Sequence, residues 1–259
     1  MNIKISFDSY LELEKIEDKA FFPLTGFMTE KDFKSVVEHM RLNNGKIFPL
    51  PVLLPLPKEN KNNIKINQKL NLIYKNTLVG EILVESIFKI DFADYLLPLF
   101  GTKDTEHPGY KILLRSGKYF IGGPTRLKKK IKYKYSEYSL TPEKVKEKIK
   151  KFQLKTVAGF QTRNVPHKAH EYILNFALKN TDGLLIHPLI GKKKRGDFLP
   201  HIVLKSFELL INLYLPKKRV LLGALTTFMR YAGPREALFH AIIRRNFGCT
   251  HFLVGRDHA

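Results

Sequence analysis

The chain has 259 residues, is 44% hydrophobic, and carries 45 lysines and arginines against 24 acidic residues, for a net charge of +21. This length and hydrophobic content suffice for one large core or two ordinary ones, and we expect two domains. No apolar run of about 18 residues occurs, and acidic residues stand where a signal peptide would be apolar, so we expect a soluble, cytoplasmic protein without a membrane span. The single cysteine, Cys249, excludes an internal disulfide or a cysteine-based metal site within these residues, and its apolar setting predicts a packed thiol.

The positive charge first suggests nucleic acid, an anionic membrane or small anionic substrates. Most of the excess is lysine scattered through loops such as LPKENKNNIKINQKL, which is typical of a solvated surface. No aromatic RNA-binding signature accompanies it, so specific nucleic-acid binding is not expected. The densest basic run, residues 126–134, is the candidate if such binding occurs.

Short apolar runs broken by Pro, Gly and Asn fill the first 138 residues and predict mainly strands. Lys75-Asn76 and Ser116-Gly117 predict hairpin-like turns. One helix is expected from Thr29, a potential N-cap, to Leu42, because apolar side chains recur there at helical spacing. Those side chains are Phe33, Val36, Val37 and Met40. This part is therefore predicted to be a small β-rich domain.

A helix with Thr141 as N-cap and Pro142 in its first turn marks the predicted domain junction, which gives domains of 1–138 and 139–259. Beyond it, apolar runs typical of buried strands alternate with helical patterns, as in βαβ units on a parallel sheet. In chain order the runs are KTVAGF, HKAHEYILNFALKN, LLIHPLI, PHIVLKSFELLINLY, RVLLGAL, PREALFHAIIRRNFG and HFLVG. Ligands of such sheets bind beyond the carboxyl ends of the strands, so chemistry is expected just after Phe160, Leu225 and Val254.

The segment after Phe160 reads QTRNVPHKAH and has the donors of an anion site. Arg163 offers a planar fork suited to a tetrahedral oxyanion, and Gln161 and Asn164 add neutral donors. His167 and His170 are three residues apart at a helix start, where backbone N–H groups also favour anions. The segment therefore predicts a phosphate or sulfate site.

Two other interpretations of the histidine pair remain open. Two histidines on a helix more often pack or face water than act in catalysis. An i, i+3 pair can also chelate a metal, but Glu171 is the only acidic or thiol ligand nearby, so we rank a metal site below anion binding.

The chain ends in Gly255-Arg256-Asp257-His258-Ala259, which has ligand-binding features of its own. The glycine permits close backbone approach, Arg256 supplies charge, and His258 can hydrogen-bond a phosphate or a purine. Residues 187–197 and 229–241 also place basic groups beside glycine after a strand. Taken alone, Lys192 to Arg195 reads as an exposed loop.

These motifs together resemble the ATP sulfurylase (sulfate adenylyltransferase) family. QTRNVPHKAHE is similar to the family motif QTRNPPHRAHE, and MRYAGPREALFHAIIRRNFGCTHFLVGRDHA to its second signature. PLTGFMTEKDFKSVVEHMRLNNGKIFPLPVLL and FGTKDTEHPGYKILLRSGKYFIGG resemble its PUA-like amino-terminal domain. The resemblance implies an α/β protein in which this β-rich domain precedes a Rossmann-like nucleotidylyltransferase domain with a parallel sheet.

The resemblance also implies a reaction: sulfate attacks the α-phosphorus of ATP in line, giving adenosine 5′-phosphosulfate and pyrophosphate, in either direction. Mg²⁺ is expected with ATP, no protein-bound metal is expected, and a homo-oligomer is expected. Carried over by position, sulfate would be held by Gln161, Arg163 and the Ala259 backbone. The implied catalytic residues are Thr162, Arg163, Asn164, His167 and His170. The implied ATP-binding residues are Gln161, Thr162, Arg163, Asn164, Gly255, Arg256, Asp257 and His258.

The chain departs from the family pattern in three ways. Val165 replaces a proline, and Lys168 replaces an arginine and so loses a bidentate fork. Family members continue beyond GRDHA, so the catalytic domain is expected to be incomplete. We expect weak or absent adenylylation by this chain alone, and association through uncovered apolar strands. Two rival functions stay open: a nucleotidyltransferase with another acceptor acid, and an RNA-binding PUA-like module with a vestigial catalytic half.

Overall fold

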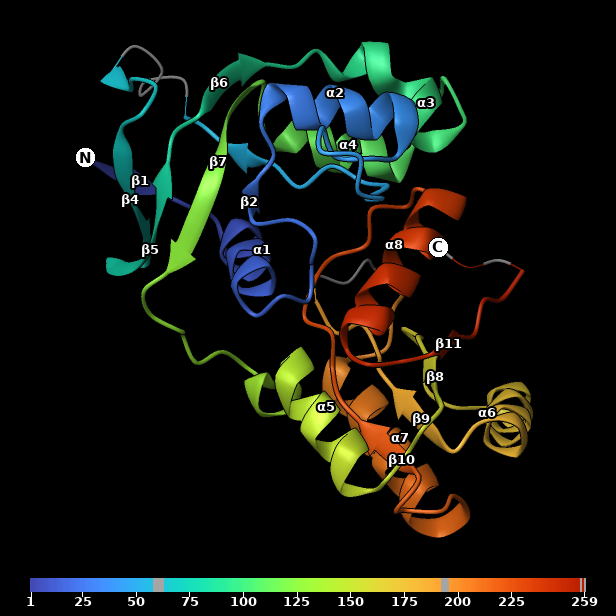
Figure 1. The fold of residues 1–259 in the computed structure, drawn as a ribbon. Helices are drawn as coiled ribbons and strands as arrows, with labels where there is room; N and C mark the ends of the chain where they lie inside the picture. Colours follow the sequence, from blue (N-terminus) through green and yellow to red (C-terminus); the bar gives the residue numbers. More distant parts are fainter. Residues whose placement is uncertain (58–62, 192–195, 257, 259) are drawn as a thin grey trace. The chain divides into compact units, whose positions relative to one another are not determined.

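The computed structural model describes residues 1–57, 63–191, 196–256 and 258 (Figure 1). The chain forms two compact units. Unit 1 comprises Met1–Ile131, Met229–Phe239 and Asp257–Ala259, and unit 2 comprises Lys132–Phe228 and His240–Arg256. The sequence-based domain division at residue 138 stays a prediction. No helix in the described part of the chain is long and apolar enough to cross a membrane.

Unit 1 contains a mixed sheet centred on its longest strand. Its strands are β1 (Asn2–Lys4), β2 (Gly26–Phe27), β3 (Leu54–Pro55), β4 (Lys69–Tyr74), β5 (Thr77–Leu83), β6 (Ser86–Lys89) and β7 (Tyr119–Leu127). The order is β1-β4-β5-β7-β2, and β7 also pairs with β3 and β6. Only the β1–β4 pair among these is parallel. The β-rich character of this part is confirmed.

Two local predictions for unit 1 are confirmed. Helix α2 (Glu30–His39) begins after Thr29, whose side chain and that of Asp32 form a reciprocal capping box. It ends three residues before the predicted Leu42, because Met40 adopts a left-handed backbone with φ +55°. Lys75 and Asn76, both with positive φ, form the two-residue turn that joins β4 to β5.

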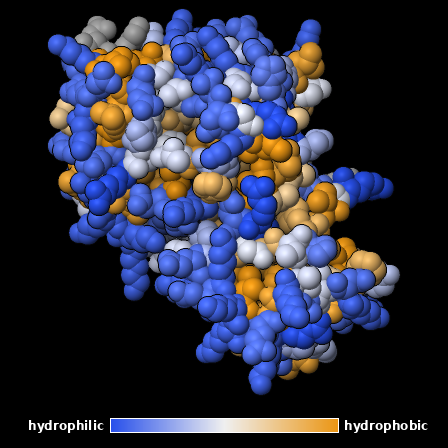
Figure 2. All heavy atoms as spheres, in the orientation of Figure 1, coloured by the Kyte–Doolittle hydropathy of each residue, from blue (hydrophilic) through white to orange (hydrophobic). Residues whose placement is uncertain are grey.

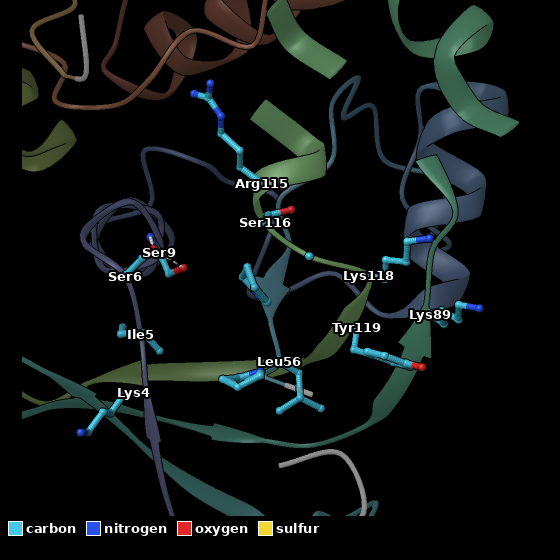
Figure 3. Close-up of a pocket in the computed structure, with 13 residues that line it drawn as sticks. Lys4, Ile5, Ser6, Ser9, Leu56, Lys89, Arg115, Ser116, Lys118 and Tyr119 are labelled. Atoms are coloured by element: carbon cyan, nitrogen blue, oxygen red, sulfur yellow. Dashed lines mark hydrogen bonds between the residues drawn. The ribbon is translucent and has the colours of Figure 1, made fainter. Parts of the chain in front are cut away.

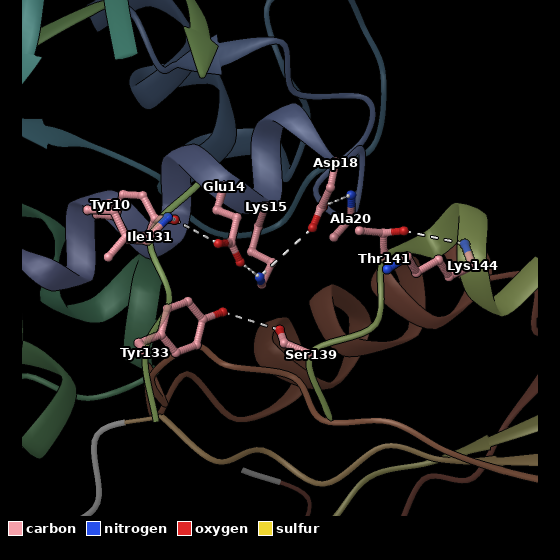
Figure 4. A network of polar contacts seen from close by, with 10 residues as sticks. All are labelled: Tyr10, Glu14, Lys15, Asp18, Ala20, Ile131, Tyr133, Ser139, Thr141 and Lys144. Carbon is pink, nitrogen blue, oxygen red and sulfur yellow. Dashed lines mark hydrogen bonds and ion pairs between the residues drawn. The ribbon is translucent and has the colours of Figure 1, made fainter. Parts of the chain in front are cut away.

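Helix α1 (Phe7–Glu17) is not predicted by the sequence pattern, which indicates strands here. All residues from Ser9 to Ile16 are buried, so the helix has no polar face and therefore no amphipathic periodicity. Its buried charges are paired: the Tyr10 hydroxyl donates to Glu14 at 2.9 Å, and Lys15 pairs with Glu14 and lies 3.9 Å from Asp18 (Figure 4). Satisfied charges of this kind can be buried, whereas unpaired ones are costly.

The segment YKILLRSGKYFIGG was expected to form strands with a hairpin-like turn at Ser116-Gly117. Its end does form strand β7, but the turn and the preceding strand are wrong. The segment begins in helix α4 (Pro108–Arg115), which His107 caps and Pro108 starts. Ser116-Gly117 ends this helix instead of turning between strands, with Gly117 at φ +92°. The short helix α3 (Leu96–Phe100) and the 3₁₀ turn η2 (Phe92–Tyr95) precede it. A short apolar run is ambiguous between helix and strand, and here the proline resolves it toward helix.

Unit 2 is a parallel sheet with helical crossovers, as the alternating pattern predicts. Its strands are β8 (Val157–Phe160), β9 (Gly183–Ile186), β10 (Val220–Leu222) and β11 (His251–Phe252), in the order β10-β9-β8-β11. Its helices are α5 (Pro142–Lys151), α6 (Lys168–Asn180), α7 (Pro200–Tyr214) and α8 (Pro234–Asn246), with the 3₁₀ turn η3 (Ser136–Tyr138) before α5. Helix α8 begins in residues grouped with unit 1. Every strand pair in unit 2 is parallel.

The core of unit 2 lies between the sheet and two of its helices. Leu174 of α6 and Val203 and Phe207 of α7 are fully buried against strand residues such as Leu184 and Ile186. Thr141 caps α5, with Pro142 in its first turn, as expected. Cys249 is buried as predicted. Hydrophilic side chains predominate on the face shown in Figure 2, while the apolar residues form separate patches.

Helix α8 packs against β8 through a glycine. A Cβ placed on Gly159 would lie 2.8 Å from Cγ and 3.0 Å from Cβ of Arg244, and 3.2 Å from Sγ of Cys249. Arg244 is completely buried, so its side chain has no open space into which it can withdraw. A side chain at position 159 therefore cannot enter without moving this helix away from the strand.

We predict that Gly159→Ala lowers the free energy of unfolding of unit 2 by about 1–3 kcal/mol, the usual cost of overpacking. The matched control is Gly223→Ala, because a Cβ there meets nothing closer than 3.5 Å and the φ angle is ordinary. That control should be neutral or stabilising by up to about 1 kcal/mol. Urea unfolding followed through the amide signals of β8 and β9 measures both. Equal effects of the two substitutions would contradict the packing argument.

Candidate functional site

The strand order of unit 2 reverses direction between β8 and β11. From β8 the chain proceeds through β9 to β10 on one side, and β11 then adds to the other side of β8. His251 pairs with Ala158 and Phe252 with Gly159, both in parallel register. Loops leaving such a switch point diverge, and the crevice between them is where open α/β sheets bind ligands. The segments leaving it here are 161–164 and 253–256.

The loop after β8 is shaped by Thr162. Its hydroxyl accepts a hydrogen bond from the Asn164 N–H at 3.0 Å, and its carbonyl accepts one from the Leu189 N–H at 2.9 Å. Thr162 is buried, whereas Asn164 is exposed at the tip of the turn. Gln161 is half-buried, and its side-chain carbonyl is shielded from solvent and has no hydrogen-bond partner among the described residues. Thr162 thus fixes the turn that presents its neighbours.

Arg163 lies beside a carboxylate from residues 187–197. Its guanidinium Nη1 is 3.7 Å from Oδ2 of Asp197, and the Arg163 side chain is 26% exposed. A carboxylate at this distance helps to orient the guanidinium, whose planar fork of donors matches a tetrahedral oxyanion. The sequence gives no sign that Asp197 is the partner, because 34 residues separate the two. The expected exposed loop at Lys192 to Arg195 lies outside the described residues.

His167 and His170 lie against each other at the start of α6. Their ring centroids are 3.8 Å apart and the rings are nearly parallel. His167 occupies the N-cap position without using its side chain as a cap, and it is exposed. His170 is half-buried, with its ring edge-on to Phe160 at 5.2 Å. Desolvation, and then the neighbouring His167, lower the pKa of His170, whereas a backbone interaction with Val165 raises it. His170 is therefore predominantly neutral at neutral pH.

A buried arginine lies at the switch point itself. The Arg244 guanidinium donates from Nη2 to the His187 carbonyl at 3.0 Å and lies 5.7 Å from the Phe252 ring centre, while its Nε has no hydrogen-bond partner in the described part of the chain. Burial lowers its pKa to about 9, which still leaves it protonated at neutral pH. The same burial raises the pKa of the adjacent Cys249 thiol to about 12. Unit 2 therefore holds a fixed positive charge against β8 and β11, and it attracts anions.

The segment after β11 is open. Gly255 and Arg256 are exposed, and a Cβ on Gly255 would meet no atom within 4 Å. Packing within the protein therefore does not require glycine at this position, whereas close approach of a ligand to the backbone would favour it. Asp257 and Ala259 lie outside the described residues, and His258 is half-buried.

Comparisons with known proteins match both halves of the chain. The model of the ATP-sulfurylase family matches residues 136–259, and that of the PUA-like domain matches residues 1–130. The sulfate adenylyltransferase of Pyrococcus abyssi is 40% identical over 257 residues, covering 99% of this chain and 67% of its own. The sulfate adenylyltransferase of Thermococcus onnurineus is 38% identical, and the match covers 100% of this chain and 67% of the relative. The chain belongs to the sulfate adenylyltransferase family. It spans about two thirds of the length of these relatives.

A solved structure supports the fold. The hexameric APS kinase from Thiobacillus denitrificans superposes with a TM-score of 0.78 at 21% identity, over 98% of this chain and 47% of that one. At this identity the likeness concerns the fold alone. The predicted order of a β-rich PUA-like part followed by an α/β part with a parallel sheet is confirmed by the matched domains and by the strand pairing.

The sulfate adenylyltransferase motif MRYAGPRE makes contacts within unit 1. Arg230 pairs with the buried Glu12 of α1, and its N–H donates to Glu236 at 2.9 Å. Burial raises the pKa of Glu12 to about 7, and the Arg230 charge opposes that rise. Arg235 donates to the carbonyls of Val36, Val37 and Pro49. Arg230 and Arg235, the basic residues that the sequence analysis noted in 229–241, are therefore engaged in contacts within the protein.

Sequence reasoning missed a group of residues at the carboxyl edge of the sheet. Thr226 and Thr227 follow β10, are almost fully buried, and have hydroxyls without a hydrogen-bond partner in the described residues. The preceding residue, Leu225, forms a bridge with Leu189. A Cβ on Gly191 would lie 1.6 Å from the Thr227 carbonyl oxygen, so this close approach requires glycine. Two threonines in an apolar run do not reveal a buried position at the edge of the sheet, because threonine is also common inside ordinary strands.

We predict that His167→Ala raises the pKa of His170, because the electrostatic repulsion by His167 is removed, yet leaves it below the ordinary value of about 6.5. Burial is the larger cause and remains in the variant. NMR titration of the His170 ring proton measures the change, and His39→Ala, an exposed histidine of unit 1, is the matched control. Because the folded-state pKa is depressed, the contribution of His170 to stability is lost as the pH falls below about 6.5. An unchanged pKa would contradict coupling of the two rings.

Proposed function

We propose that this chain transfers the adenylyl group of ATP to sulfate, releasing pyrophosphate. The observation that carries the proposal is the parallel pairing of β11 with β8, which directs residues 161–164 and Gly255-Arg256 to one end of the same two strands. Switch points of this kind bind nucleotides in other open α/β sheets. The relatives named sulfate adenylyltransferase are similar in sequence to this chain along almost its whole length, with 38–40% identity.

The proposed reaction needs no nucleophilic side chain. A sulfate oxygen attacks the α-phosphorus in line, a new P–O bond forms, and the bond from that phosphorus to the oxygen bridging to the β-phosphate breaks. The electron pair leaves with pyrophosphate, and no proton is transferred because sulfate and the phosphates are ionised. Positioning and electrostatic stabilisation therefore supply the catalysis.

Each proposed role follows from a side chain's chemistry and place. Arg163 holds sulfate through its planar guanidinium, which Asp197 helps to orient, and the Gln161 amide adds a neutral donor. Thr162 shapes the loop, so its proposed catalytic contribution is the placement of Arg163 and Asn164. His167 and His170 face the charge that grows on the departing pyrophosphate, and Arg244 adds a fixed positive potential from within unit 2.

Nucleotide binding is proposed for the two segments at the ends of β8 and β11. Gly255 lets the backbone approach the phosphates, and Arg256 supplies a flexible cation. Asp257, His258 and the Ala259 backbone complete the proposal on the basis of sequence resemblance alone. In this assignment Gln161 and Arg163 contact both substrates, because sulfate and the α-phosphate must meet, while Thr162 and Asn164 are assigned to ATP.

Magnesium is proposed to arrive with ATP. No group of three or more histidine, cysteine, aspartate or glutamate side chains suited to hold a metal lies within the described ranges. Mg²⁺ commonly binds through substrate phosphates with few protein carboxylates, so the residues present fit a metal carried by the nucleotide. When bound, it would neutralise part of the phosphate charge. Domains of 1–138 and 139–259, homo-oligomerisation and a cytoplasmic location also remain proposals.

We predict that Arg163→Ala lowers sulfate-dependent pyrophosphate release by about a hundredfold or more, as loss of a strong charge-stabilising contact does. Arg163→Lys should recover only part of this loss, because the ammonium keeps the charge but lacks the planar fork. Arg245→Ala, an exposed arginine of α8, is the matched control and should keep normal turnover.

The measurement is the rate of pyrophosphate release with ATP at increasing sulfate concentration. Near-normal turnover by Arg163→Ala would contradict the assignment of this residue. No sulfate-dependent release by the unaltered chain would contradict the proposed function, and faster release with a different oxyanion would identify another acceptor acid.

A further inference from the structure

Unit 1 contains a pocket of about 530 Å³ that is separate from every residue assigned above (Figure 3). It lies where the start of α1, the segment after β3, the end of β6 and the turn between α4 and β7 meet. Pockets that bind small molecules commonly measure about 300–1,000 Å³. The size therefore suits one ligand of moderate mass.

Positive charge surrounds this pocket. Among the described residues that line it, Lys4, Lys89, Arg115 and Lys118 are cationic and none is acidic. In the part of unit 1 that the structure describes, none of these four forms an ion pair. The acidic residues elsewhere in unit 1 do attract cations, as Glu81 does with Lys69 and Lys128. Four cations around the rim of one pocket repel one another, and an anionic ligand would relieve that repulsion.

One wall of the pocket offers two serine hydroxyl groups and the start of helix α1. Ser6 and Ser9 of the α1 segment lie across the pocket from Lys118 and Tyr119 in Figure 3. Ser6 caps α1 by accepting from the Ser9 N–H at 3.0 Å. Helix α1 runs for 11 residues away from this point, so its partial positive charge adds to that of the side chains. The site thus favours phosphate over a carboxylate of lower charge.

Apolar and aromatic side chains complete the lining. The pocket is also lined by Ile5, Leu56, Tyr119, Pro55 and Pro57. Prolines and an aromatic ring form flat surfaces on which a planar group can stack. The cations stand around the rim instead of converging on one point, which suits a ligand with its phosphate at the edge and its apolar part inside (Figure 3).

We propose that this pocket binds a small phosphorylated molecule with a planar apolar part, the chemistry of a mononucleotide. The pocket belongs to unit 1, whereas the switch point belongs to unit 2, so the proposal goes beyond adenylyl transfer and does not rest on it. Phosphate would contact the rim cations, and the planar part would lie against Leu56 and Tyr119.

The experiment titrates AMP into the ¹⁵N-labelled chain and follows assigned amide signals. We expect saturable shifts of the amides of Ser9, Gly117 and Lys118. Inorganic phosphate should shift the same amides with an affinity about tenfold lower or weaker still, because it lacks the part that fills the apolar wall. Because each amide is resolved, AMP binding at 161–164 is observed separately, and failure there leaves the pocket result intact.

The test variant is Lys89→Glu with Lys118→Glu, and the matched control is Lys31→Glu with Lys103→Glu, two exposed lysines of unit 1 that do not line the pocket. Both pairs change the net charge equally. The pocket variant should lose about tenfold or more in AMP affinity at Ser9 and Gly117, as lost charge-assisted contacts do, while the control stays within about twofold. Lys4→Gln is the milder second variant, and it should weaken binding in the same direction.

Four outcomes would overturn the proposal. They are no saturable shift of the pocket amides with AMP, an equal loss of affinity in the control variant, equal affinity for inorganic phosphate and AMP, and binding of a short single-stranded RNA without binding of AMP. Unchanged amide signals elsewhere in unit 1 show that each variant is folded.

Discussion

The pairing of β11 with β8 is the interaction on which the candidate site depends. It consists of two parallel residue pairs and the hydrogen bond from the Leu253 N–H to the Gly159 carbonyl at 3.0 Å. About ninety residues separate the strands in sequence, yet this pairing directs both polar segments to the same end of the sheet. Without it, Arg163 and Arg256 would be unrelated surface arginines. Because parallel strands need a long crossover, α8 must also be in place for the pairing to form.

The contact of α8 with β8 explains how unit 2 retains the buried guanidinium of Arg244, whose burial is energetically unfavourable. Arg244 is fully buried, donates to main-chain carbonyls, and lies against a glycine that leaves room for it. Within the described residues Arg244 forms no ion pair with a carboxylate. Burying a guanidinium in this way is unfavourable, so packing against β8 and Phe252 has to offset that cost. Near the proposed site for polyanions, the same positive charge would favour substrate binding. We infer that electrostatic complementarity to the substrate accounts for its position.

The two units use charged residues in different ways. In unit 1 the buried charges on α1 and in residues 229–239 bind one another, as Glu12 does with Arg230, and leave little for a ligand. The cations around the pocket of unit 1 are exposed and unpaired among the described residues. In unit 2, Arg163 is partly exposed and its Nη1 lies 3.7 Å from Asp197, and Arg256 is exposed. Positive charge thus occurs in each unit at positions where an anion can reach it.

The sequence by itself determined the elements whose signals are local. Thr29 and Thr141 accept backbone hydrogen bonds at their helix starts, and Lys75-Asn76 adopts the positive φ of a tight hairpin. The alternation of buried-strand and helical runs predicted the parallel sheet, since strands covered by crossover helices are apolar throughout. The motif residues 161–170 and 255–259 could be recognised, because their donors stand next to predicted strand ends.

Only the tertiary structure decided features that depend on distant partners. Helix α1 lacks an amphipathic pattern because charges at Glu12, Glu14 and Lys15 are buried by pairing, and no window of sequence reveals a partner such as Arg230. The contact of Arg163 with Asp197, the burial of Arg244 against Gly159, and the close approach of Gly191 to Thr227 likewise arise from long-range packing. Local propensity and periodicity report on neighbours along the chain, whereas these positions are set by neighbours in space.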